Sequence, residues 1–158
     1  MKKKYPPRFD SEENRSLAFN YSLKYLSFRN RSTKEIKDYL ARKKFEDATI
    51  AASIEKLNEL KFLNDEEFAR SWIESRQKHK GKSKFVLKQE LRMKGIDKSM
   101  IDHTLGNAQD DFETAKILFL KKKKKLGNLP PEEFKKKMIG FLSRKGFGWG
   151  IINKLLKN

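Results

Sequence analysis

The sequence contains no cysteine, and this absence removes several kinds of chemistry. Disulfides, thiolate metal ligands and cysteine nucleophiles are excluded. A reducing, cytoplasmic setting agrees with that composition. There are two histidines, His79 and His103, and neither has a partner at the spacing of metal ligands. Both are interpreted as surface residues, and no metal, cofactor or small-molecule substrate is expected.

Long apolar runs, prolines and glycines are also scarce. No stretch approaches the roughly 18 apolar residues that a membrane-spanning helix needs. The basic opening MKKKYPPRFD lacks the apolar segment of a secretory signal, so no membrane partner is expected. With four prolines and eight glycines among 158 residues, few positions interrupt a helix, and long helices are expected.

Positive charge, by contrast, is abundant. The chain has 38 Lys and Arg against 21 Asp and Glu, a net charge of +17. Residues 76–94 hold eight basic residues against one acid, residues 121–158 hold twelve against two, and residues 31–63 are nearly balanced at eight against six. A field of this sign attracts nucleic acid, anionic membranes or acidic protein surfaces. The middle and the end of the chain are therefore expected to carry the polyanion-binding surface.

One pattern of apolar residues occurs three times at a spacing of 51 residues, without gaps. Such self-similarity is the signature of a structural repeat. The matched sets are Leu17, Phe68 and Phe119; Ile36, Leu87 and Met138; Leu40, Leu91 and Leu142; Phe45, Ile96 and Phe147; Ile50, Ile101 and Ile152; and Ile54, Leu105 and Leu156.

Each repeat is predicted to form three helices. In the first helix of the first repeat, Leu17, Tyr21, Tyr25 and Phe28 are spaced to share one face. The segment from Ser32 to Glu35 has the form of a capping box. Asn64 before three acids predicts another helix start, as do Pro130 and Pro131 before two glutamates.

Glycines mark where the second helix of a repeat ends. Gly95 and Gly146 stand where a C′ glycine is expected, whereas Lys44 occupies that place in the first repeat. That turn is predicted to be either strained or differently closed. The fold class is therefore all-α: three tandem three-helix repeats with a period of about 51 residues, in an elongated, curved array. The expected boundaries are a flexible basic tail at 1–10 and repeats at 11–63, 64–109 and 110–158.

No catalytic constellation can be assembled from these residues. The glycines of residues 146–150 (GFGWG) resemble a phosphate loop, but no preceding strand and no G-K-[ST] accompany them, and a helix stop explains Gly146. The acids of residues 65–67 fit helix capping better than catalysis. The chain is predicted not to be an enzyme. A metal-dependent nuclease is the alternative that an assay with Mg²⁺ or Mn²⁺ would revive.

Phosphate binding requires only positive charge on a surface, which this chain supplies. The lysines of residues 78–84 alternate through a predicted loop and the start of a helix, and residues 121–125 are five consecutive lysines extending a helix that begins near Asp111. A solvated, charge-rich helix end is the other interpretation of such a run. The candidate DNA-binding or filament-binding residues are Arg76, Lys78, Lys80, Lys82, Lys84, Lys88, Arg92, Lys94, Lys121, Lys122, Lys123, Lys124, Lys125, Arg144 and Lys145.

Few aromatic side chains are left for stacking on bases. Phe68, Trp72, Phe119, Phe141 and Phe147 mostly fall on positions that the repeat predicts to be buried. A single-strand reader of the OB-fold type is therefore not expected. Phe85 and Trp149 are the two exceptions. For Trp149, capping of the last hydrophobic cluster is favoured over exposure.

Several short motifs, taken in order, resemble the RecX family of recombination regulators. They are residues 31–36 (RSTKEI), 63–69 (LNDEEFA) running on to Arg76, Gly81, 90–96 (ELRMKGI), and 141–147 (FLSRKGF) with Ile151 and Ile152 behind. The resemblance covers about residues 14–156. Two positions depart from the family pattern: Lys82 stands where a proline follows Gly81, and Lys44 where the first repeat has a glycine.

The resemblance implies a non-enzymatic protein of three tandem three-helix repeats that modulates the RecA recombinase, with inhibition favoured. Family members are described as binding along the groove of the RecA filament on single-stranded DNA and as having DNA affinity of their own. The implied partners are therefore the RecA filament and single-stranded DNA, with double-stranded DNA as a further candidate. A stand-alone helical DNA-binding or architectural protein is the alternative function.

Overall fold

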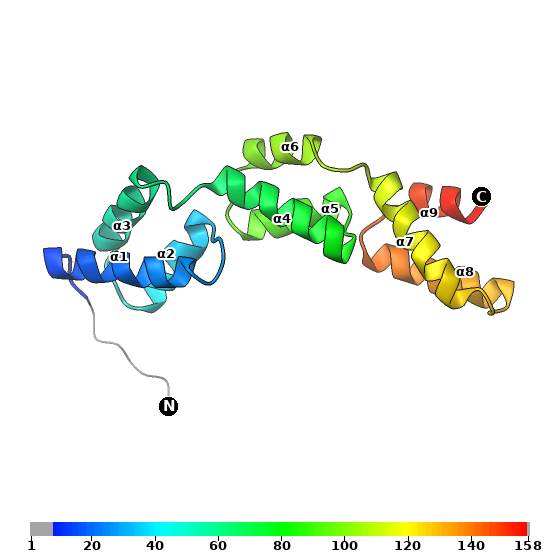
Figure 1. Cartoon of the computed structure of the whole chain (residues 1–158), viewed down its shortest axis with the longest axis horizontal. Coiled ribbons are helices and arrows are strands. Elements are labelled where there is room, and N and C mark those ends of the chain that lie inside the picture. The colour runs from blue at the N-terminus through cyan, green and yellow to red at the C-terminus, as the bar shows by residue number, and fades with distance from the viewer. Residues whose placement is uncertain (1–7, 158) are drawn as a thin grey trace, which may run out of the picture. The chain divides into compact units, whose positions relative to one another are not determined.

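The structure, a computed structural model, describes residues 8–157, and within them it consists of helices (Figure 1). The predicted all-α fold is confirmed: over those residues the only strand-type pairing is an isolated bridge between Arg8 and Phe45. The helices are α1 (Glu12–Leu26), α2 (Thr33–Arg42), α3 (Asp47–Glu59), α4 (Asp65–Lys80), α5 (Lys84–Met93), α6 (Lys98–Gly106), α7 (Asp111–Leu126), α8 (Pro131–Arg144) and α9 (Trp149–Lys157).

The chain divides into two compact units. Unit 1 comprises Met1–Phe68 and Met93–Asp97, and unit 2 comprises Ala69–Arg92 and Lys98–Asn158. The elongated, curved arrangement of the repeats stays a prediction. The predicted tail at 1–10 lies outside the described residues as far as position 7. From Arg8 onward the chain joins the α2–α3 turn, because the Arg8 amide donates to the carbonyl of Lys44 at 2.9 Å and the Glu46 amide donates to the carbonyl of Arg8 at 3.2 Å.

The core of unit 1 lies between α1, α2 and α3. Ile36, Leu40 and Leu57 are completely buried there, and each such side chain stabilises the fold by about 1.5–3 kcal/mol through burial. The predicted face of α1 is partly wrong. Leu17 is 38% exposed and Phe28 is 74% exposed, although both were expected to face the core.

The counterparts of Leu17 in the other repeats, Phe68 and Phe119, are buried as predicted, and a small residue is buried in the first helix of every repeat. Ala18, Ala69 and Ala115 are all completely buried, and their small side chains let neighbouring helices approach closely. On α1 the next buried residue is Ser22, whose hydroxyl donates to the carbonyl of Ala18 at 2.9 Å and is thereby satisfied. Apolar periodicity missed this pattern, because alanine and serine contribute little to it.

The 51-residue period holds for the starts of the third helices and for the ends of the second helices, but not for the start of every first helix or of α8. The third helices begin at positions 47, 98 and 149, whereas the first helices begin at 12, 65 and 111. The last repeat lengthens its second helix, since α8 has 14 residues where α2 and α5 have 10. The added first turn of α8 packs on α7, since Phe134 meets Phe119 edge to face with ring centroids 6.3 Å apart.

The predicted helix boundaries are largely confirmed by their caps. The Ser32 capping box is present, the Asn64 side chain accepts from the Glu67 amide at 3.0 Å, and α8 begins at Pro131. The turns that end the second helices have positive φ angles of 76° at Gly95 and 91° at Gly146. Lys44 adopts the same conformation at φ 68°. The first of the two alternatives for that turn is therefore correct: it is closed in the same way, with the strain that a β-carbon adds.

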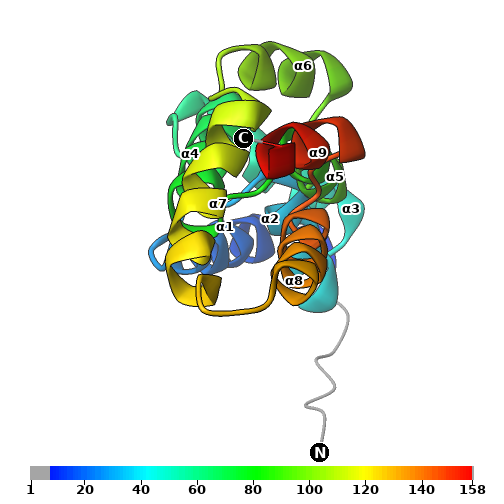
Figure 2. The same ribbon diagram turned by 90° about the vertical axis from the view of Figure 1, so that its right-hand side faces the viewer.

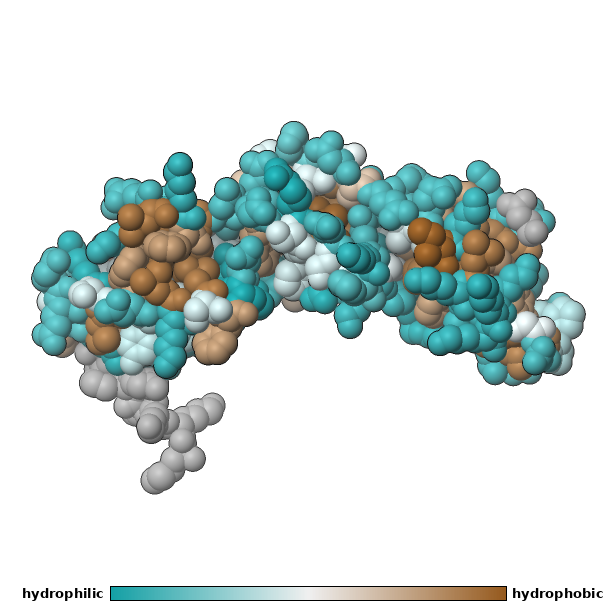
Figure 3. All heavy atoms as spheres, in the orientation of Figure 1, coloured by the Kyte–Doolittle hydropathy of each residue, from teal (hydrophilic) through white to brown (hydrophobic). Residues whose placement is uncertain are grey.

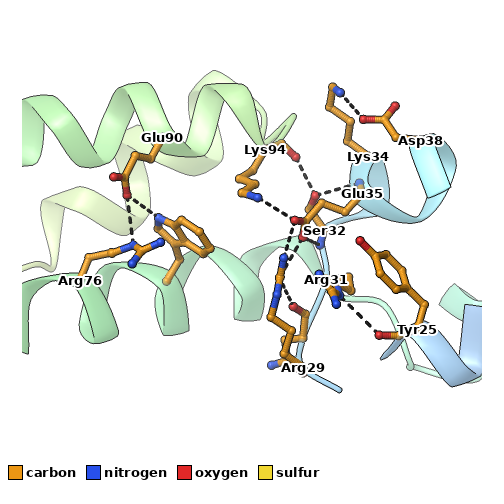
Figure 4. A network of polar contacts seen from close by, with 12 residues as sticks. Tyr25, Arg29, Arg31, Ser32, Lys34, Glu35, Asp38, Arg76, Glu90 and Lys94 are labelled. Atoms are coloured by element: carbon orange, nitrogen blue, oxygen red, sulfur yellow. Dashed lines mark hydrogen bonds and ion pairs between the residues drawn. The ribbon is translucent and has the colours of Figure 1, made fainter. Parts of the chain in front are cut away.

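A polar network within unit 1 surrounds the capping box (Figure 4). The Ser32 hydroxyl donates to the carbonyl of Lys94 at 2.7 Å, and the Thr33 amide donates to Asp65 at 2.8 Å. Glu35 accepts hydrogen bonds from Arg29 and Lys94, each at 2.7 Å. Burial alone would raise the pKa of Glu35, but these bonds and one from the Ser32 amide outweigh it and hold the pKa at about 2.

In unit 2 the helices α7, α8 and α9 enclose a second core (Figure 2). Met138 and Leu142 are completely buried and Ile152 is nearly so, as the repeat alignment predicts. Phe147, at the turn before α9, is also buried. Residues 69–92 and 98–106, from α4 to α6, complete the unit, with Leu87, Leu91 and Ile101 completely buried.

Candidate nucleic-acid interface

In unit 2, Lys145 lies close to Lys80 and Lys82, although it follows Lys80 by 65 positions in the sequence. The loop of residues 81–83, between α4 and α5, packs on the end of α8: the Ser83 amide donates to the carbonyl of Lys145 at 3.0 Å. In return the Lys145 ammonium group donates to the carbonyl of Lys80 at 2.6 Å. Burial, together with repulsion from Lys82 and Lys80, holds the pKa of Lys145 below its usual value. These three residues, Lys80, Lys82 and Lys145, form the lysine cluster.

Gly146 allows this close approach. Its φ of 91° favours glycine, and a β-carbon at that position would lie 2.3 Å from Cγ2 of Val86 and 2.4 Å from Oγ of Ser83. The amide of Lys84 is fixed at the same place by Asp111, which accepts from it at 2.8 Å. A glycine that stops α8 thus also brings Lys145 to the loop that carries Lys82.

Two of the predicted site residues are held by a carboxylate. Glu90 pairs with Nε of Arg76 at 3.4 Å (Figure 4). It also accepts from the Trp72 indole at 2.9 Å and forms an ion pair with Lys82. Burial would raise the pKa of Glu90, but these contacts dominate and lower it. The Arg76 guanidinium also lies over the Trp72 ring, 4.3 Å from its centroid. A phosphate at Lys82 or Arg76 would therefore compete with Glu90.

The other basic residues of α4 and α5 differ in their availability. Lys88 pairs with Asp102 at 2.5 Å, and Lys94 pairs with Glu35 within unit 1. Lys78 and Arg92 are exposed, and Lys84 is half-buried. The structure corrects one detail, because Lys78 and Lys80 belong to the end of α4 rather than to a loop.

The five consecutive lysines end α7, as predicted. Their positive charge suits a helix C-terminus, which is the structural interpretation of the run. Lys122 lies over the ring of Phe141 at 5.1 Å and Lys123 over Phe119 at 5.9 Å, both measured to the ring centroid. Lys121, Lys124 and Lys125 are exposed.

A basic groove of about 730 Å³ runs between α7 and α8. It brings Lys122 together with Arg144, which is exposed, and with Lys136 and Lys137. The last two were missed in the sequence, although Lys136 and Arg144 are eight positions apart and so share a helix face. Lys137 pairs with Glu133 at 2.7 Å.

Charge separates the two units sharply. Unit 2 contains 22 basic and 8 acidic residues, a net charge of +14, whereas unit 1 contains 16 and 13, a net charge of +3. The field that attracts polyanions therefore belongs to unit 2.

Two exposed aromatic side chains follow the lysine cluster closely in the chain. Phe85, in the first turn of α5, is 65% exposed, and Trp149, which opens α9, is 59% exposed. The expectation that Trp149 caps the last hydrophobic cluster is wrong. The buried face of α9 consists of Ile152 and Leu155 and does not include Trp149. A β-carbon added at Gly148 or Gly150 would meet nothing within 4 Å, so the surroundings of Trp149 are open.

Unit 2 offers positive charge and exposed aromatic rings on its surface. Over residues 8–157 no three His, Asp or Glu side chains come together as a metal site would require, and no helix there is long and apolar enough to cross a bilayer. Grouped lysines, followed in the chain by exposed aromatic rings, suit a ligand that carries both phosphates and planar bases.

Three family models match this chain in tandem. They are described as the first, second and third three-helix domains of RecX and match residues 18–57, 64–105 and 109–156. The regulatory protein RecX of Bacillus subtilis (strain 168) is 39% identical over 140 residues, which are 85% of this chain and 52% of that protein. The chain thus spans about half the length of the Bacillus relatives it matches.

A second relative is matched over most of its length. The regulatory protein RecX of Amycolatopsis mediterranei (strain U-32) is 31% identical over 154 residues, covering 96% of this chain and 88% of that protein. Among solved structures, RecX from Lactobacillus salivarius superimposes with a TM-score of 0.78 at 27% identity, covering 93% of this chain and 97% of that one. With three consecutive domain matches and such relatives, the chain belongs to the RecX family, whose members are regulatory rather than enzymatic.

Proposed function

We propose that this protein binds the RecA recombinase and its filament on single-stranded DNA, and that it inhibits the recombinase. Membership of the RecX family supports the partner. The observation that carries the nucleic-acid part is the lysine cluster, in which Lys80, Lys82 and Lys145 meet inside a unit of net charge +14. The charges of Lys82 and Lys80 repel that of Lys145, and a phosphate would relieve that repulsion.

Unit 2 is the part that meets DNA in this proposal. Lys80 and Lys145 contact phosphates, Lys82 exchanges Glu90 for a phosphate, and the open rings of Phe85 and Trp149 stack on unpaired bases. Stacking on an aromatic ring contributes about 1–3 kcal/mol per base and works with any base. A protein held across several recombinase protomers restrains their relative movement, and ATP hydrolysis and strand exchange, which need that movement, slow down.

The direct test adds the protein to recombinase assembled on single-stranded DNA. The rate of ATP hydrolysis falls and the filaments shorten as the protein approaches stoichiometric amounts. If neither changes, the inhibitory role is wrong.

A pair of matched triple variants tests the surface. Changing Lys80, Lys82 and Lys145 to Gln weakens binding to an oligothymidylate and reduces the slope of log K against log salt by up to about 2, at roughly 0.7 for each phosphate that is no longer neutralised. The control changes the exposed Lys24, Lys37 and Lys61 of unit 1 to Gln, removing the same charge, and leaves affinity nearly unchanged. Equal losses of affinity in the two variants would mean that only net charge matters.

A stand-alone DNA-binding or architectural protein is the second candidate, because the charge of unit 2 would serve it equally well. Recombinase pull-down after nuclease digestion separates the two. A recombinase regulator retains its partner when the nucleic acid is gone, whereas an architectural protein loses it.

A further inference from the structure

Unit 1 carries an apolar groove that none of the lysine chemistry uses. It lies between α2 and α3 and has a volume of about 800 Å³. Its floor consists of Ala41, Ile50, Ala51 and Ile54. Figure 3 shows hydrophobic side chains gathered over part of unit 1, with hydrophilic ones around them. Ala41 and Ala51 are exposed, and their short side chains leave the groove hollow beside Ile50 and Ile54, which are largely buried.

The other two repeats do not preserve this groove. Ile50 and Ile54 have apolar counterparts 51 and 102 positions later, but Ala41 is replaced by Arg92 and Ser143, and Ala51 by Asp102 and Asn153. In the second repeat the corresponding place is bridged by the ion pair of Lys88 with Asp102 at 2.5 Å. The open apolar floor is therefore a property of the first repeat alone, and packing of the repeat does not require it.

The rim of the groove is acidic in a strongly basic protein. Asp38 from α2 and Asp47, Glu55 and Glu59 from α3 line it, against the single base Lys37. Asp38 pairs with Lys34 at 2.5 Å, with both side chains about half exposed. The other three carboxylates form no ion pair with any residue that the structure describes.

The fold gains nothing from the two glutamates. Glu55 and Glu59 are four positions apart, so their charges repel across one helix face. Both lie in the C-terminal half of α3, where the helix dipole disfavours negative charge. In the other repeats the position of Glu55 is held by Gly106 and Lys157. Carboxylates that weaken their own helix, beside an open apolar floor, indicate a ligand with positive charge.

We propose that the groove between α2 and α3 of unit 1 is a docking site for a basic amphipathic helix of a protein partner. The aliphatic face of that helix enters over Ile50 and Ile54, and its flanking Lys or Arg residues meet Glu55 and Glu59 on one side and Asp38 on the other. This is the helix-in-groove mode of recognition, with rim charges that steer and orient the ligand. The acidic rim repels phosphates, so DNA is not expected in this groove. The positive charge of unit 2 repels a basic helix, so the helix is expected to bind unit 1. The proposal does not depend on what unit 2 binds.

The test uses the full chain and two synthetic helical peptides of about 18 residues, five turns of helix. Both have Leu and Ala along one face; one carries Lys on its flanks and the other Glu. At near-physiological salt, fluorescence anisotropy shows saturable binding of the Lys peptide and none of the Glu peptide. The double change Glu55→Lys with Glu59→Lys weakens binding at least about tenfold, since it reverses two rim charges. Ala51→Arg, which fills the floor, has a similar effect.

The matched control changes Glu12 and Glu13, exposed acids of α1 outside the groove, to Lys and so alters net charge equally. It retains wild-type affinity for the Lys peptide. Circular dichroism checks folding, and Glu55→Gln with Glu59→Gln replaces the reversal if that chain fails to fold. Equal weakening by the control, equal binding of the Glu peptide, or no binding at all overturns the proposal. The proposal is also overturned if the Glu55→Lys, Glu59→Lys variant, without peptide, sediments differently from the wild-type protein. That result would identify a second copy of the chain as the occupant of the groove.

Discussion

The hydroxyl of Ser32 donates a hydrogen bond to the main-chain carbonyl of Lys94 at 2.7 Å, although the two residues are 62 positions apart. The same oxygen accepts from the amide of Glu35 and so begins α2. Ser83 repeats the arrangement in unit 2: its hydroxyl accepts from the Val86 amide and its own amide donates to the carbonyl of Lys145. A buried serine that starts one helix thus also holds the Lys-Gly turn that ends another.

Replacing Ser32 with Ala removes both bonds at once. Loss of the cap costs about 1 kcal/mol, and removing this donor from the part-buried Lys94 carbonyl costs about 1–3 kcal/mol more. Ser32→Ala is therefore expected to lower the free energy of unfolding by about 2–4 kcal/mol in urea denaturation. Ser11→Ala is the control, because Ser11 caps α1 at an exposed site and its loss costs about 1 kcal/mol. Equal losses for the two variants would contradict the double role of Ser32.

Glu35 makes part of this stability depend on pH. Its pKa is about 2 in the folded chain and about 4.3 when unfolded. Because the folded pKa is the lower one, the stabilisation is complete above the unfolded pKa and is lost as the pH falls through about 2. Glu35→Gln should therefore cost about 2 kcal/mol at pH 7, and progressively less between pH 4 and pH 2. Urea denaturation across that range measures it, and a pH-independent difference would count against the ion pairs.

Local features of this fold could be predicted from the sequence. The caps at Ser32, Asn64 and Pro131 and the turns at Gly95 and Gly146 depend on a few neighbouring residues, and all five are as predicted. The failures have a shared cause. Contacts between helices decide which face of α1 is buried, and small residues such as Ala18 leave no strong periodic signal.

The candidate site shows the same division. The sequence identified Lys80, Lys82 and Lys145 as basic, but it could not indicate that they meet, because the 65-residue gap closes only when the turn at Gly146 packs on Ser83. Nor could it separate Lys82, which Glu90 holds, from an exposed lysine such as Lys78. In the sequence all lysines carry the same charge and cannot be told apart. In the structure, burial and ion pairing decide which of them a phosphate can reach.

Gly146 is predicted to tolerate no side chain. Gly146→Ala forces a β-carbon onto Val86 and Ser83 and strains a φ of 91°, so the free energy of unfolding falls by about 2–4 kcal/mol. Gly150→Ala is the matched change. It lies in α9 with nothing within 4 Å of its β-carbon, and it should stabilise the chain by up to about 1 kcal/mol, the difference in helix propensity. Thermal unfolding compares the two, and a neutral Gly146→Ala would show that the turn can relax.

Lys44 offers the opposite experiment. It holds a φ of 68°, a conformation that a β-carbon disfavours and that glycine adopts freely. Lys44→Gly should therefore raise the free energy of unfolding by about 0.5–1 kcal/mol. The gain is partly reduced because glycine also makes the unfolded chain more flexible. Lys37→Gly is the control, because a glycine in the interior of α2 should lower the free energy of unfolding by about 1 kcal/mol. Chemical denaturation of both variants tests whether Lys44→Gly raises the free energy of unfolding.

Trp149 reports directly on base stacking, because the chain has two tryptophans and the other is enclosed. Trp72 donates to Glu90 and is covered by Arg76, whereas Trp149 is 59% exposed. An oligothymidylate should therefore quench the fluorescence of the wild-type chain, and Trp149→Phe should abolish most of that quenching while keeping the affinity, since phenylalanine also stacks. Trp149→Ala should weaken binding about 5- to 100-fold, the equivalent of 1–3 kcal/mol for one base. Phe28→Ala, at a more exposed ring of unit 1, should leave binding unchanged. Quenching that persists in Trp149→Phe would place the bases elsewhere and leave the lysine cluster to bind phosphates alone.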